Sequence, residues 1–124
     1  MSQLTPEQQR AVEARGKLVC VDAGAGSGKT RVLTHRVAYL IGERGVSPYS
    51  ILAVTFTNKA AREMIARLNS LIGPDCQRLT IGTFHSVCVR ILRREASHLS
   101  LDSNFVIYDA DDQRRLVTQA IKEL

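Results

Sequence analysis

The residues with the clearest chemical meaning form a run of small side chains that ends in lysine and threonine, Ala23-Gly24-Ala25-Gly26-Ser27-Gly28-Lys29-Thr30. Small residues let consecutive backbone N–H groups converge on phosphate oxygens, and the start of a following helix adds a partial positive charge. In such a loop Lys29 reaches the β- and γ-phosphates and Thr30 holds Mg²⁺. We therefore predict a nucleotide phosphate site, with Lys29 and Thr30 as its catalytic residues.

The run departs from the general pattern G-x-x-x-x-G-K-[ST] at one position, where Ala23 replaces the first glycine. This change removes one freely rotating position but keeps Gly26 and Gly28. The alternative is a strand-to-helix turn of small residues that binds no ligand. That alternative requires Lys29 and Thr30 to follow the last glycine by chance.

Two further loops combine hydroxyl, aromatic and basic groups, namely Thr55-Phe56-Thr57-Asn58 and Thr83-Phe84-His85. Hydroxyls and helix N-termini suit phosphodiester oxygens, and an exposed ring can stack on an unpaired base for roughly 1–3 kcal/mol. Both loops follow apolar runs, so they form a candidate track for single-stranded DNA. Alternatively, Phe56 and Phe84 fill the core while the threonines cap helices.

Other charged groups allow two interpretations. Arg90, Arg93 and Arg94 share one face of an expected helix and either contact phosphates or remain solvated. Asp109 follows an apolar run as a metal-binding carboxylate can, but a helix begins directly after it. We expect Asp109 to cap that helix, and we assign no catalytic base.

Apolar runs alternate with amphipathic segments along the chain. We expect strands over residues 17–22, 50–56, 78–82 and 105–108, and helices over 30–42, 59–72, 84–98 and 110–124. This alternation predicts parallel βαβ units in a three-layer α/β sheet. Ligands of such sheets bind beyond the C-terminal strand ends, where the three loops fall. The apolar stripe of the last helix continues to the chain end, so it either folds back or needs a partner.

Composition restricts the class of protein. The chain has 124 residues, of which 44% are hydrophobic and 23% charged, as in one globular domain rather than a disordered or membrane protein. Its formal net charge of +5 favours an anionic partner. No secretory signal is visible, so we expect a cytoplasmic protein with no membrane partner. The three cysteines and three histidines show no metal-ligand spacing.

Taken together, the motifs resemble the N-terminal part of the UvrD/Rep/PcrA group of superfamily 1 DNA helicases. Residues 4–12, Leu-Thr-Pro-Glu-Gln-Gln-Arg-Ala-Val, look like the Q motif of that family. The run over residues 23–30 is similar to motif I, including its first alanine. Residues 54–61 look like motif Ia, and residues 82–86 look like the motif that follows it.

The resemblance implies particular roles. Gln8 takes the glutamine role and contacts the adenine edge, since an amide offers both a donor and an acceptor. Arg31 lies near the nucleotide, and the two Thr-Phe loops lie along single-stranded DNA. The cofactors are ATP and Mg²⁺, and the DNA partners are single strands and duplex junctions.

The resemblance also implies a P-loop NTPase, RecA-like motor domain that is incomplete over residues 1–108, with 109–124 beginning an inserted helical subdomain. The D-E-x-x motif with its carboxylates and the second motor domain are absent from these residues. We therefore expect the chain to be the ATP-binding part of a longer helicase that moves 3′ to 5′ and unwinds duplex in repair or replication. Its further partners are the rest of the helicase chain and repair or replication proteins, and the fragment alone is expected to be inactive.

Three alternatives remain open. A small P-loop phosphotransferase would use Asp109 as its metal-side carboxylate. A nucleic-acid-binding module with a vestigial ATP site would bind single strands independently of ATP. The N-terminal part of a recombination helicase-nuclease would share these motifs and differ elsewhere.

Overall fold

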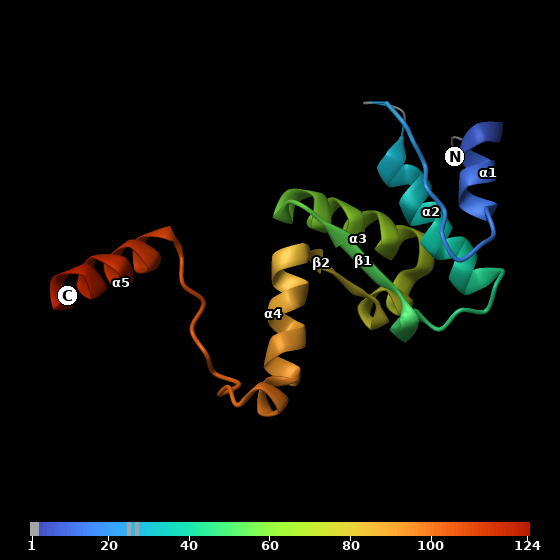
Figure 1. Ribbon diagram of the computed structural model, residues 1–124. Coiled ribbons are helices and arrows are strands. Elements are labelled where there is room, and N and C mark those ends of the chain that lie inside the picture. Colours follow the sequence, from blue (N-terminus) through green and yellow to red (C-terminus); the bar gives the residue numbers. More distant parts are fainter. Residues whose placement is uncertain (1–2, 25, 27) are drawn as a thin grey trace. The chain divides into compact units, whose positions relative to one another are not determined.

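The computed structural model describes residues 3–24, 26 and 28–124 (Figure 1). Ala25 and Ser27, both predicted to contact the nucleotide, lie outside the described residues. The chain divides into two units, Met1–Val87 and Cys88–Leu124. The elements are, in order, α1 (Pro6–Glu13), α2 (Lys29–Gly42), η1 (Pro48–Ser50), β1 (Leu52–Thr55), α3 (Asn58–Ile72), η2 (Gly73–Arg78), β2 (Thr80–Thr83), α4 (Phe84–Arg94), η3 (Ala96–Leu99) and α5 (Ala110–Glu123).

The sheet of the first unit consists of β1 and β2, which run parallel and are joined by α3. Their register pairs Leu52 with Thr80 at one end and Thr55 with Thr83 at the other. Helix α3 packs on both strands, α2 packs on α3, and α1 packs on α2 (Figure 1). The predicted α/β class and the strands expected over residues 50–56 and 78–82 are therefore confirmed.

The predictions of strands over residues 17–22 and 105–108 are wrong. Neither segment pairs with β1 or β2, and apolar side chains in both are exposed, with Leu18 at 91% and Val106 at 75%. A strand needs a neighbour for its backbone N–H and C=O groups, so an apolar run cannot form one by itself. The described residues contain a two-stranded sheet, which is smaller than the sheet that we expected.

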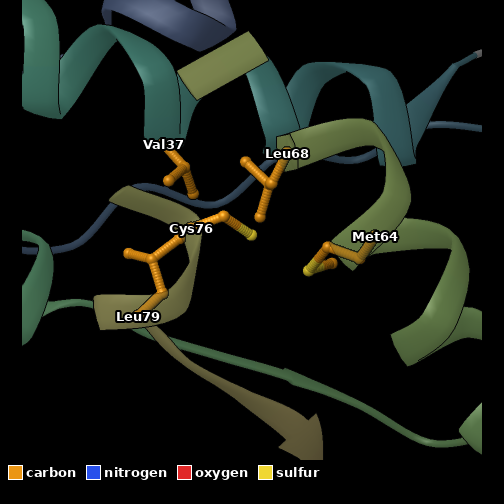
Figure 2. Close-up of a cluster of buried hydrophobic side chains, with 5 residues drawn as sticks. All are labelled: Val37, Met64, Leu68, Cys76 and Leu79. Carbon is orange, nitrogen blue, oxygen red and sulfur yellow. The ribbon is translucent and has the colours of Figure 1, made fainter. Parts of the chain in front are cut away.

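The core of the first unit lies where α2, α3 and η2 meet (Figure 2). Leu68 is completely buried there, and the thiol of Cys76 points between the helices. Burial raises the pKa of the Cys76 thiol, which lies 3.8 Å from the carbonyl oxygen of Ile65. The buried cluster joins residues of α2, α3 and η2 with the residue that follows η2: Val37, Met64, Leu68, Cys76 and Leu79. It fixes α2 against the βαβ unit and therefore positions the start of α2.

The four predicted helices are present as α2 to α5, apart from the last residues of the third, where η3 replaces α-helix, whereas α1 was not predicted. Asp109 caps α5, since its Oδ1 accepts from the backbone N–H of Asp112 at 2.8 Å. This bond lowers the pKa of Asp109 below its ordinary value. The capping role predicted for Asp109 is confirmed. Within the described residues, no helix is long and apolar enough to span a bilayer.

Candidate nucleotide and DNA sites

Helix α2 begins directly after Gly28, which has left-handed backbone at φ +85°, and Gly26 also has positive φ, at +75°. L-residues with a Cβ avoid this region, so the loop needs glycine at both positions. Gly28 is the N-cap residue, and its carbonyl oxygen accepts from the Val32 N–H at 3.0 Å. Lys29 and Thr30 form the first turn, whose N–H groups have no acceptor within the helix. The sequence therefore places a lysine, a hydroxyl and helix-start donors together.

The side chain of Gln8 lies against the same loop. A Cβ added at Gly28 would lie 2.7 Å from Gln8 Nε2, so the glycine leaves room for the amide. Gln8 is held by a capping box in which its Oε1 accepts from the Thr5 N–H at 3.0 Å and its N–H donates to Thr5 Oγ1 at 3.2 Å. Two candidate nucleotide residues far apart in sequence, Gln8 and Gly28, are thus neighbours in space.

A cavity of about 740 Å³ lies beside this loop. Its volume falls within the range of roughly 300–1,000 Å³ that is usual for small-molecule sites. The wall combines apolar side chains with charged groups, and residues of α1, residues 19–24 and one face of α2 contribute to it: Thr5, Glu7, Gln8, Ala11, Val19, Val21, Asp22, Ala23, Gly24, Lys29, Val32, Leu33 and Arg36. The cavity therefore brings together Gln8 and the residues Ala23, Gly24 and Lys29, all of which were predicted to contact the nucleotide. Leu33, an apolar wall residue of α2, is half-exposed.

Arg36 is one of the wall residues that sequence reasoning did not assign to the site. Its Nη1 donates to three carbonyl oxygens at the end of α1, those of Ala11 at 3.1 Å, Val12 at 2.9 Å and Ala14 at 2.9 Å. The available signal was spacing, since Arg36 lies seven residues after Lys29 and therefore on the same helix face. The sequence alone does not show which carbonyl oxygens a single arginine of an amphipathic helix will bind.

The two Thr-Phe loops lie side by side because the strand register pairs Thr55 with Thr83. The next residues, Phe56 and Phe84, stack with ring centroids 5.2 Å apart and an interplanar angle of 39°. Phe56 is 90% exposed and Phe84 is 49% exposed. The alternative in which these rings fill the core is therefore wrong. The structure forms an exposed aromatic pair at the carboxyl ends of both strands.

Threonines at these loops hold the helix starts. Thr57 Oγ1 accepts from the Ala60 N–H at 3.1 Å, and Thr83 Oγ1 accepts from the Ser86 N–H at 3.1 Å. Thr55 Oγ1 donates to the Thr57 carbonyl oxygen at 3.0 Å. Thr83 is 8% exposed, so it supports the loop from beneath. Asn58 and His85 are exposed, and their predicted contacts with DNA remain predictions.

The arginines of α4 do not form one open basic face. Arg93 donates to the carbonyl oxygens of Ser103 at 3.2 Å and Phe105 at 3.4 Å, and its guanidinium lies 4.9 Å from the Phe105 ring centroid. Arg94 pairs with the adjacent Glu95 at 3.1 Å. Arg93 therefore holds the segment that follows η3, which reduces its availability for phosphate.

Within the described residues, no group of three or more His, Cys, Asp or Glu side chains could hold a metal ion. The metal prediction therefore depends on Thr30 with its nucleotide. Arg31 lies one residue further along α2, and its carbonyl oxygen accepts from Thr34 Oγ1 at 3.0 Å. Binding of a Mg²⁺-nucleotide by the loop and the first turn of α2 stays a prediction.

The parallel strands joined by a helix define an α/β protein with functional groups at the carboxyl ends of its strands. Residues 4–124 match the model of the UvrD/REP helicase N-terminal domain, and the chain belongs to this family. It is 52% identical over 119 residues to the ATP-dependent DNA helicase PcrA of Staphylococcus epidermidis, covering 96% of this chain and 16% of that protein. The PcrA of Staphylococcus aureus is 49% identical over 122 residues, covering 98% and 17%.

These matches confirm the resemblance to the UvrD/Rep/PcrA group. The chain spans about one sixth of the length of these relatives, because the aligned part covers 16% and 17% of them.

Proposed function

We propose that this chain is the ATP-binding part of a DNA helicase motor and belongs to a three-layer, RecA-like domain of a longer protein. The longer protein couples ATP hydrolysis to 3′–5′ movement along single-stranded DNA and unwinds duplex junctions in repair or replication in the cytoplasm. Residues 109–124 begin its inserted helical subdomain. The comparisons support this proposal, since both relatives are named ATP-dependent DNA helicases.

One observation carries the nucleotide part of the proposal. The left-handed Gly28 begins α2, and Lys29 and Thr30 follow it while Gln8 lies against it. Backbone N–H groups and Lys29 would bind the phosphates, and Gln8 would contact the adenine edge. Thr30 would hold Mg²⁺, which neutralises phosphate charge when bound.

The aromatic pair supports the DNA part. Phe56 and Phe84 are an exposed pair of rings, and the exposed residues Asn58 and His85 follow them closely in the chain. Bases of any sequence can stack on such rings, as a translocating motor requires. In this proposal Arg31 and the loop glycines bind the nucleotide, whereas the Thr-Phe loops bind DNA.

Calorimetry on the folded chain tests the nucleotide part. We expect ATP and ADP, with Mg²⁺ in excess, to release heat with a Kd of about 1 mM or tighter, or roughly −4 kcal/mol. As a control, Lys17→Ala should bind both nucleotides as the wild-type chain does, because Lys17 is an exposed lysine outside the cavity wall. The absence of heat at millimolar nucleotide in folded protein would contradict the proposal.

Replacement of Phe56 by alanine tests the DNA part. We expect single-stranded DNA to bind about tenfold more weakly, within the roughly 1–3 kcal/mol that stacking one base contributes. Tyr49→Ala is the matched control, because Tyr49 is 75% exposed and precedes β1 rather than following it. Fluorescence anisotropy with labelled oligonucleotide measures both. Equal affinity of Phe56→Ala and wild type would exclude the aromatic pair from the DNA track.

A further inference from the structure

Arg36 joins α1 to α2 through the C-terminal end of α1. The last carbonyl groups of a helix have no N–H donor within that helix, and here one guanidinium nitrogen donates to the carbonyl oxygens of Ala11, Val12 and Ala14. Helix α1 has only eight residues, too few to be stable in isolation. Besides this contact, Val12 is buried at 3% exposure. The position of α1 therefore depends strongly on Arg36 and Val12.

Near its other end, α1 presents Gln8 to the phosphate loop. Gln8 Nε2 is close enough to exclude a Cβ at Gly28, while Arg36 lies two turns further along α2. Both attachments of α1 are thus made to one helix, and that helix also begins with Lys29. A rigid α1–α2 pair would hold the amide of Gln8 at a constant distance from the phosphates.

We propose that Arg36 is a positioning residue that holds Gln8 in place and thereby sets the preference of the site for adenine. This inference rests on the proposed function, because it assumes that Gln8 contacts the base. An amide distinguishes adenine from guanine only when its donor and acceptor are held in register with the base edge. Loss of the Arg36 bonds frees the end of α1 and lets Gln8 move, while Lys29 and the loop backbone stay with α2.

The base preference of Arg36→Met provides the test. Methionine keeps a long apolar stem and removes the donors. We expect the ratio of GTP Kd to ATP Kd, measured with Mg²⁺, to fall about tenfold. The average affinity for the two triphosphates should change less than this ratio. Arg36→Lys can still donate to carbonyl oxygens, so it should restore part of the ratio. Arg44→Met, an exposed arginine just beyond α2, should leave the ratio unchanged.

A double-mutant cycle of Arg36→Met with Gln8→Ala tests whether Arg36 acts through Gln8. If Arg36 acts through Gln8, Arg36→Met will not lower the ratio further in the Gln8→Ala background. An equal loss of ATP and GTP affinity would show that Arg36 only stabilises the fold and would overturn the inference, while leaving the proposed function intact. Failure of the wild-type chain to bind ATP would overturn both. If Arg36→Met does not fold, Arg36→Ala, which also removes the donors, takes its place, and an unchanged ratio in folded Arg36→Ala beside an altered one in Gln8→Ala would likewise overturn the inference.

Discussion

Replacing Lys29 by alanine will lower DNA-stimulated ATP hydrolysis by about 100-fold to 1,000-fold in the longer helicase that we propose contains this chain. Lys29 is the first residue of α2 and follows the left-handed Gly28 directly. Its ammonium group would neutralise charge on the β- and γ-phosphates, and that charge grows in the transition state. Removing the ammonium therefore costs more in catalysis than in binding.

Steady-state hydrolysis with and without single-stranded DNA measures this effect. Lys17→Ala removes one positive charge from a nearby exposed position and should keep nearly full activity. Full activity of Lys29→Ala would rule out its role at the phosphates. By contrast, single-strand binding that ignores both ATP and Lys29→Ala, with no ATP hydrolysis by the wild type, would favour the nucleic-acid-binding module with a vestigial ATP site.

Gly28→Ala is expected to weaken ATP binding by about 10-fold to 100-fold. Left-handed backbone costs an alanine roughly 1–2 kcal/mol. The new methyl group would also lie 2.7 Å from Gln8 Nε2. Gln8 is a flexible side chain and can move away, so the clash itself costs little stability, but the amide then leaves the base site and disturbs its capping bond with Thr5.

Gly45→Ala is the matched control for Gly28→Ala. Gly45 also has positive φ, at +65°, but no atom lies within 4 Å of an added Cβ. Thermal unfolding should show a similar strain in both variants, whereas calorimetry should show weaker ATP binding in Gly28→Ala alone. An equal ATP affinity in the two variants would contradict the contact between Gln8 and the loop.

Local chemistry made several features predictable from sequence. The phosphate-loop residues carry their signal in residue type and spacing, so a strand partner is not needed to find Lys29. Helices are similarly local, because their hydrogen bonds close within four residues. The capping function of Asp109 could be inferred for the same reason. Strands over 17–22 and 105–108 were wrong because pairing depends on neighbours that an apolar run does not specify.

The sequence by itself determined the family, the approximate positions of α2 to α5 and the residue types of the candidate sites. Tertiary structure alone decided which of these residues meet. The parallel register of Thr55 with Thr83 placed Phe56 against Phe84, and the packing of α1 on α2 brought Gln8 to Gly28. The physical reason is that such contacts join segments far apart in the chain and depend on packing between elements, whereas motifs and helices depend on neighbouring residues.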